Sequence, residues 1–331
     1  MMKDPTPADF PFRAASPSGM SVELNANGSV RRMDCGDIML NVFLGNQAEG
    51  GPVNIHLRRL GEAVETIPLL GPGSPALCQT DSRGIHAAGK WNDLLFRVRL
   101  VLAESAKAWF WQVEVENTGT SAVTCDLIHT QDVAIAHYGA TRLNEFYVSQ
   151  YVDHSPLNHA VAGMAVASRQ NQPMGGRFPW TVIGALGKGV SWSTDALQFH
   201  GMATRAGKPA VALVAGLPGE RLQHEHSLVA IQDEPFVLEP GARSQRGFFG
   251  WFEADKPAAT SAEDARWIDA ALALPEAACP PWPPEAPASR PASSLFSTAP
   301  LLEAEPLDPA EIRDYFGAEQ RHAEIKPEIR S

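Results

Sequence analysis

The sequence predicts a mainly β protein, in which a large two-sheet antiparallel supersandwich is followed by short linker helices. Three observations support this. Apolar and polar residues alternate with a period of two over most of residues 16–253, which places one face of each strand on a core and the other in water. Glycine, proline and asparagine separate the runs. Helical periods are almost absent there, so successive strands form antiparallel sheets without crossover helices.

The strands follow one another from the N-terminal side of this region. Val22 and Leu24 lead to Asn27-Gly28, a turn signal that predicts a β-hairpin. The further runs that predict strands are 94–102, 109–115, 123–127, 181–186, 211–215, 228–231 and 247–252. So many strands in succession predict two large sheets packed face to face.

The pattern changes after Glu253. Thr260-Ser261-Ala262-Glu263 has the form of a capping box, in which the Thr260 hydroxyl accepts from a backbone amide and Glu263 reaches back. Apolar residues at helical spacing follow. We therefore expect a short helix within 254–275.

The two ends of the chain differ from the sandwich in composition. Residues 1–15 are expected to be an N-terminal extension. Residues 276–300 are rich in proline, which predicts an extended, semi-rigid linker. In 301–331, Asp308 suits an N-cap and Pro309 suits the first helical turn, so we expect a short helical tail.

Composition and charge narrow the class of protein. The chain has 331 residues, of which 44% are hydrophobic and 20% are charged, enough for a substantial core. Its net charge of -11 argues against nucleic acid and anionic membrane surfaces as partners. The N-terminus lacks the apolar core of a signal peptide, and no apolar run approaches the length of a membrane span.

Cysteine usage indicates the compartment. The four cysteines are scattered and form no CxxC pair, so we expect reduced thiols in a cytoplasmic protein. They are Cys35, Cys78, Cys125 and Cys279.

Motifs for nucleotide, hydrolase and metal chemistry are missing or weak. No phosphate-binding loop and no GxSxG elbow occurs. His224-Glu225-His226 would place two imidazoles on one face of a strand, but zinc needs a third ligand and nothing nearby supplies one. We interpret the motif as polar residues on a strand edge, and expect no metal and no cofactor.

Acidic pairs for glycoside chemistry leave no spacing signal, because their members come from distant parts of a fold. None of the possible carboxylates stands out. They are Asp126, Asp132, Glu145, Asp153 and Asp195.

The segment 142–159, RLNEFYVSQYVDHSPLNH, combines aromatic rings with amides, carboxylates and histidines. A strand is expected over 132–138 before it and another over 160–168 after it, while Ser155-Pro156-Leu157 breaks regular structure. The segment is therefore predicted to be a long loop on a rigid sheet. Aromatic faces beside amides and imidazoles suit a sugar; alternatively, the rings cover an edge of the core.

Several short motifs resemble the N-terminal half of cellobiose-phosphorylase-like enzymes, glycoside hydrolase family 94, formerly glycosyltransferase family 36, and a module of cyclic β-1,2-glucan synthases. The similarity extends from about residue 16 to the end of the chain. The residues that carry it are 109–117, 132–133, 144–151, 191–199, 246–250 and the helix after Ala259.

The resemblance implies a supersandwich similar to galactose-mutarotase-like folds. In that family an α/α barrel follows and carries the catalytic general acid, and the sandwich supports a dimer. We expect this chain to stop where the barrel would begin, so we assign no catalytic residue. A family loop that approaches the acceptor sugar is similar to the region of Gln150 and Tyr151.

Three functions remain open. The first is the N-terminal portion of an inverting β-glucoside phosphorylase, with inorganic phosphate as co-substrate and a β-linked glucose oligosaccharide or the catalytic barrel as partner. The second is a non-catalytic carbohydrate-binding or assembly module. A second copy of the chain, in a homodimer, is a further expected partner. The third is a mutarotase-like epimerase.

The first two functions share one predicted binding surface, and the epimerase needs a histidine and a glutamate in one cleft. The predicted sugar- or barrel-facing residues are Tyr147, Gln150, Tyr151, Asp153 and His154. The pool for an epimerase is His129, His137, His154, His159 and Glu145.

Overall fold

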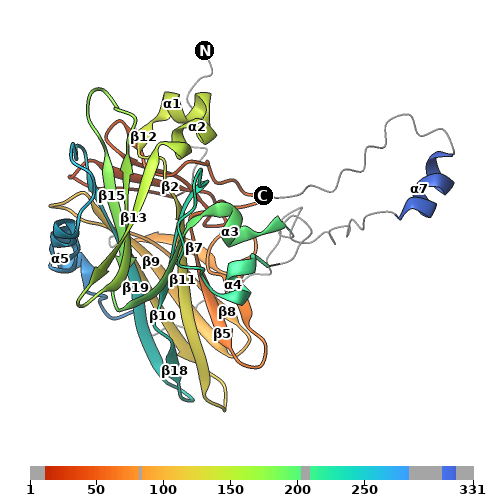
Figure 1. Ribbon diagram of the computed structural model, residues 1–331. Coiled ribbons are helices and arrows are strands. Elements are labelled where there is room, and N and C mark those ends of the chain that lie inside the picture. The colour runs from red at the N-terminus through yellow and green to blue at the C-terminus, as the bar shows by residue number, and fades with distance from the viewer. Residues whose placement is uncertain (1–11, 82–83, 203–208, 283–307, 318–331) are drawn as a thin grey trace.

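The computed structural model describes residues 12–81, 84–202, 209–282 and 308–317, and the described strands form two sheets (Figure 1). The smaller sheet consists, in order, of β1 (Phe12–Ala15), β2 (Met20–Leu24), β3 (Val30–Cys35), β4 (Ile38–Met39) and β12 (Ala136–His137). The path through the larger sheet is β6 (Glu65–Pro68), β5 (Asn54–Leu60), β11 (Val123–Asp132), β17 (Ser227–Asp233), β16 (Gly189–Asp195), β14 (Gly163–Gln170), β15 (Trp180–Ala185), β19 (Arg243–Glu253), β10 (Ala108–Asn117), β9 (Leu94–Leu102), β8 (Gly84–Trp91) and β7 (Leu77–Asp81).

The predicted mainly β, antiparallel sandwich is confirmed. Off the main path, β13 (Val152–His159) pairs with β14, and β18 (Phe236–Leu238) pairs with β11. Among the described strands, the ladders are antiparallel except where β14 and β16 meet in parallel at Gly163 and Gly189. The hairpin predicted at Asn27-Gly28 joins β2 to β3.

Side chains from both sheets meet in one core. Trp109 and Trp111 of β10 are buried in it, as their alternation predicts, and Val22 and Met33 contribute from the smaller sheet. Gly250 of β19 lies opposite Trp109, and a Cβ at this glycine would overlap the indole ring. The pairing of the two central strands therefore depends on glycine at this position.

Helix α5 (Arg266–Leu272) covers the outer face of β10, β15 and β19. Its Ile268 and Ala271 are buried with Phe110 in a second apolar cluster. Trp267 stacks on Trp251 with 5.3 Å between the ring centroids. This helix lies in the interval 254–275, where a helix was predicted.

Residues 262–282, which we call the C-terminal strap, continue across the same face. The side-chain amide of Gln112 donates to the carbonyl oxygens of Glu276 and Ala278, at 2.9 Å each. The guanidinium of Arg99 lies 4.0 Å from the ring centroid of Trp282. The first residues of the predicted linker 276–300 therefore pack on the sandwich, and the rest of it lies outside the described residues.

The cap of the strap begins one residue later than predicted. Ser261, not Thr260, is the N-cap, and its amide donates to the carboxylate of Asp264, not Glu263, at 2.9 Å. The Thr260 hydroxyl instead accepts from the indole N–H of Trp180 at 3.0 Å. A buried indole donor needs an acceptor, so Thr260 is committed to the sandwich.

One short helix corrects the sequence interpretation. Residues 211–215, predicted as a strand, form α4 (Val211–Ala215), which packs beside α3 (Ala196–His200). Phe199 and Leu213 are buried there with Ile128 of β11. An apolar run of five residues is compatible with either element, because period alone does not separate a strand from a short buried helix.

The ends of the chain also differ from expectation in part. Residues 12–15, placed in the N-terminal extension, form β1 and pair with β2; residues 1–11 lie outside the described part. In the predicted tail, Asp308 caps α7 (Pro309–Phe316), and the remainder of 301–331 is not described. No helix in the described ranges combines the length and apolarity needed to cross a membrane.

Candidate functional site

The segment 142–159 is a pair of helices followed by a strand, not a loop. The predicted strand 132–138 is short, because β11 ends at Asp132 and only Ala136–His137 pair again, as β12. Then come α1 (Tyr138–Leu143), α2 (Glu145–Gln150) and β13. Pro156, expected to break regular structure, lies inside β13, which pairs only with β14 and so tolerates a residue without an amide donor.

Asn144 separates the two helices and sets the direction of the second. Its side-chain oxygen accepts the amide of Tyr147 at 3.0 Å, which makes it the N-cap of α2. Val148 and Ser149 face inwards and are buried, while Phe146, Tyr147 and Gln150 are exposed. The helix thus presents its aromatic and amide side chains to solvent.

Four exposed rings form what we call the aromatic surface: Phe43, Phe146, Tyr147 and Tyr151. They are 38–53% exposed. The rings of Tyr147 and Tyr151 lie 4.8 Å apart, and those of Phe43 and Phe146 lie 6.3 Å apart. Phe146 also lies 5.4 Å from His226, which precedes β17. Phe43 and His226 thus lie beside α2 although both are far from it in the sequence.

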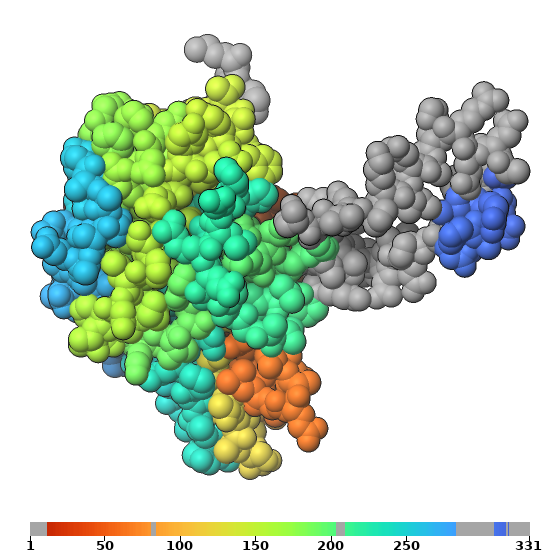
Figure 2. All heavy atoms as spheres, viewed as in Figure 1, coloured from red at the N-terminus to blue at the C-terminus, as the bar shows by residue number. Residues whose placement is uncertain are grey.

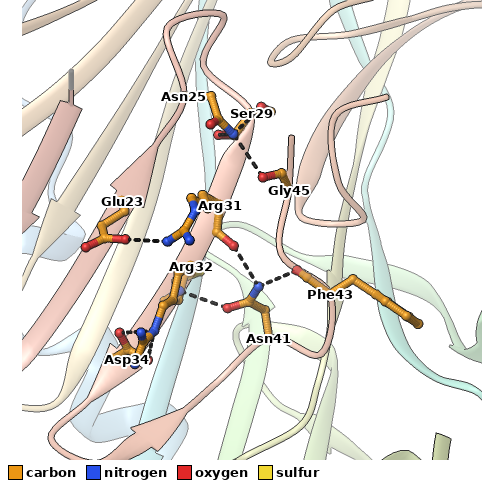
Figure 3. A network of polar contacts seen from close by, with 10 residues as sticks. Glu23, Asn25, Ser29, Arg31, Arg32, Asp34, Asn41, Phe43 and Gly45 are labelled. Carbon is orange, nitrogen blue, oxygen red and sulfur yellow. Dashed lines mark hydrogen bonds and ion pairs between the residues drawn. The ribbon is translucent and has the colours of Figure 1, made fainter. Parts of the chain in front are cut away.

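Phe43 is held in place by its backbone. The amides of Val42 and Phe43 donate to the Asp132 carboxylate at 2.8 and 2.6 Å. Asn41 bridges the strand and the loop, because its side chain accepts from Met33 N at 2.8 Å and donates to Phe43 O at 2.6 Å (Figure 3). Burial raises the pKa of Asp132 to about 6.

A cleft of about 400 Å³ lies beside these aromatic residues, and we call it the polar cleft. It is lined by Gln150, Val152, Asp153, Asn171, Arg221, Leu222, Gln223, His224 and Glu225. The guanidinium of Arg221 pairs with the Asp153 carboxylate at 2.9 Å. Helix α2, the start of β13 and the turn 221–225 lie on one face of the molecule (Figure 2).

The predicted site residues divide between the two features. Tyr147 and Tyr151 belong to the aromatic surface, Gln150 and Asp153 line the polar cleft. His154 is not on this face: it is fully buried, its Nδ1 lies 2.8 Å from the Ser168 hydroxyl, and burial lowers its pKa to about 3. Successive side chains of β13 point to opposite sides of the strand, so Asp153 faces the polar cleft while His154 faces the interior.

The other candidate carboxylates are committed to structure, except Glu145 in the first turn of α2. Asp126 forms a buried two-point ion pair with Arg58, at 2.6 and 2.7 Å. Asp132 holds the loop that carries Phe43, and Asp195 caps α3.

The histidines proposed for an epimerase do not share a cleft. His129 is buried between Trp111 and Phe248, and burial lowers its pKa to about 4. His137 lies beside Asp37, and His159 beside Asp269.

The His224-Glu225-His226 motif is a turn before β17, not a strand edge. Glu225 is buried while both histidines are exposed. Within the described ranges, no three histidine, cysteine, aspartate or glutamate side chains gather as a metal site would require. Sequence reasoning considered this motif only for metal binding and so missed its place in the polar cleft, which depends on long-range pairing.

The chain thus combines a mainly β sandwich with exposed aromatic rings beside a polar cleft. The chain belongs to the family described as the SOGP N-terminal domain, whose model matches residues 23–250. This confirms the resemblance found in the sequence.

A sequence relative is a phosphorylase. The chain is 29% identical over 245 residues to a 1,2-beta-oligoglucan phosphorylase of Listeria innocua; the match covers 73% of this chain and 21% of the relative. The chain thus spans about a fifth of that protein's length.

Solved structures with a similar fold have low sequence identity. A putative kojibiose phosphorylase from the human microbiome is 9% identical, with a TM-score of 0.38, and the match covers 76% of this chain and 31% of that one. A putative aldose 1-epimerase of Escherichia coli K12 is 9% identical with a TM-score of 0.40, covering 73% and 98%.

Proposed function

We propose that this chain serves as the carbohydrate-facing N-terminal sandwich of an inverting phosphorylase-type protein that acts on β-linked glucose oligosaccharides. The observation that carries the proposal is the 29% identity to a 1,2-beta-oligoglucan phosphorylase over most of this chain. Inorganic phosphate would be the co-substrate, and the general acid would lie in a catalytic barrel. A cytoplasmic location fits the four free cysteines.

The role proposed for this chain is to meet sugar, or the barrel that holds it, through the aromatic surface and the polar cleft. Exposed rings offer flat faces to the C–H surfaces of a sugar. The Gln150 amide beside them can both donate to and accept from hydroxyl groups. These side chains are not needed to bury the core, since Phe146, Tyr147 and Gln150 all point away from it.

A non-catalytic carbohydrate-binding or assembly module, including a homodimer, is the second candidate, because the same exposed rings suit either role. The epimerase has no such support. The histidines available to it are dispersed, and two of them, His129 and His154, are buried in the neutral form.

Catalysis and binding test the proposal separately. We expect purified chain, incubated with phosphate and either cellobiose or a β-1,2-linked glucan, to release no sugar 1-phosphate. We expect Tyr151→Ala to weaken binding of β-1,2-linked glucose oligosaccharides at least several-fold in calorimetric titrations. Phosphorolysis by the isolated chain, or a Tyr151→Ala chain with unchanged glucan affinity, would contradict the proposal.

A further inference from the structure

We propose that the polar cleft is a subsite for a neutral oligosaccharide, and that His224 contacts the sugar from the wall opposite Gln150 and Asp153. The inference rests on the proposed function and adds the second wall of the cleft and a further binding residue to it. Sugar binding by the aromatic surface alone would not need the two walls of the polar cleft.

The cleft has two walls from distant parts of the sequence. One wall is the end of α2 and the start of β13, with Gln150 and Asp153. The other is the turn 221–225. The ion pair between Arg221 and Asp153, 68 residues apart in sequence, ties the walls together at 2.9 Å.

Hydrogen bonds on its buried side hold the turn 221–225 in place. The buried Glu225 carboxylate accepts from the Thr194 hydroxyl and from the Leu222 amide, both at 2.7 Å. The next two amides are anchored as well: His226 donates to Asp195 at 2.8 Å, and Ser227 donates to the Ser149 hydroxyl at 2.7 Å. This wall is therefore rigid.

His224 stands at the exposed tip of this anchored turn with a φ of +59°. A residue with a β-carbon rarely adopts this left-handed conformation, and glycine or asparagine fits it better. Such strain persists where the surroundings fix it, and it gathers at ligand-binding positions. Glycine would be less strained here, and His224 instead presents an imidazole at the cleft.

The lining suits hydroxyl groups better than anions. Gln150, Asn171 and Gln223 supply amides, each with donors and an acceptor, which match the mixed character of sugar hydroxyls. The positive charge of Arg221 is already balanced by Asp153, and Glu225 adds a further carboxylate. A volume of about 400 Å³ falls within the range of small-molecule sites, ~300–1,000 Å³.

A protein partner fits the adjacent surface better than it fits the cleft. Interface cores are depleted of charge and rich in aromatic side chains, as the aromatic surface is. The cleft is lined mainly by amides and charged groups, which an apolar protein face would leave unpaired. Sugar hydroxyls would pair with them.

His224→Gly tests the inference, because glycine removes the imidazole and relieves the backbone strain together. Asn92→Gly is the matched control: Asn92 also has a positive φ, +51°, but sits in the turn between β8 and β9. Calorimetric titrations use a β-1,2-linked glucose tetrasaccharide, with inorganic phosphate as a separate probe. We expect His224→Gly to raise the Kd for the tetrasaccharide about tenfold without lowering Tm, and Asn92→Gly to leave the Kd unchanged.

Each outcome decides a separate question. If the unaltered chain and His224→Gly bind the tetrasaccharide equally, the cleft inference is overturned while the proposed function stands. If the unaltered chain binds no β-linked glucan at all, both fail. Phosphate that binds in competition with the tetrasaccharide would overturn the assignment of a neutral ligand. Loss of association with a barrel-bearing protein in His224→Gly, with sugar affinity intact, would make the cleft a protein-docking site and overturn the inference.

Discussion

Two adjacent residues of β13, Asp153 and His154, have different roles because their side chains lie on opposite faces of the strand. Asp153 points into the polar cleft and pairs with Arg221, while His154 points inwards and meets the Ser168 hydroxyl. Both were predicted to belong to one surface. The amino-acid types suggested this, but the period of two separates them. His154 is thus part of the fold, and Gln150 is part of the candidate site.

His154→Ala and Gln150→Ala should therefore differ in stability. A buried imidazole that loses its place leaves Ser168 unpaired, so we expect His154→Ala to cost about 1–3 kcal/mol in unfolding free energy. Gln150 is exposed, and Gln150→Ala should stay within about 0.5 kcal/mol of the parent. Urea unfolding at pH 7.5 measures both.

The stability difference between the parent and His154→Ala should depend on pH. Burial lowers the folded-state pKa of His154 from 6.5 to about 3, so the unfolded state binds the extra proton between these values. The stability contributed by neutral His154 is full above pH 6.5 and is lost as pH falls, by up to about 1.4 kcal/mol per pH unit. The difference between parent and His154→Ala should shrink between pH 7.5 and 5; a constant difference would show that His154 is solvated.

Elements with a sustained pattern were predictable, and those decided by long-range contacts were not. The sequences of β9 and β10 alternate over many residues, and the structure has strands there. α4 spans five apolar residues, too few for a period to appear, and its helical form depends on packing against α3. The turn 221–225 joins the site through long-range contacts, such as the ion pair between Arg221 and Asp153, which no local pattern encodes.

Helix α2 is an element whose orientation depends on one cap. We expect Asn144→Ala to remove the acceptor for the Tyr147 amide, at a cost of about 1 kcal/mol to the helix. Because α2 lies outside the sheets, the loss should be local: amide exchange in α2 accelerates roughly fivefold while Tm changes little. Asn144→Asp retains an N-cap acceptor and is the control. Unchanged exchange in Asn144→Ala would show that tertiary contacts alone hold the helix.

At the scale of the whole molecule, the sandwich depends on residues that follow it. The C-terminal strap, which includes α5, covers Phe110, Trp180 and Trp251 on the outer face of the large sheet. Family resemblance predicted helices after the sandwich, but not that 276–282 would be bound to it. The hydrogen bonds from Gln112 to two backbone carbonyls are invisible in a proline-rich sequence.

Removing the strap should make the sandwich aggregate. A chain ended after Glu253 exposes the tryptophan-rich face, and exposed apolar patches of this kind associate. We expect it to bind a hydrophobic dye and to elute as oligomers in size-exclusion chromatography. A chain ended after Trp282 retains every contact of the strap and is the control. A monodisperse chain ending at Glu253, with the melting temperature of the control, would contradict this account.

The position of the strap also has a consequence for biosynthesis. Ribosomes add about 5–20 residues per second, so β10 waits roughly 7–27 s for its neighbour β19, and longer for the residues that shield its outer face. During that interval Trp109, Phe110 and Trp111 have emerged with β9 on one side but without β19 on the other. Until residues 262–282 have left the exit tunnel, the outer apolar face of the nascent chain lacks the side chains that cover it in the folded protein.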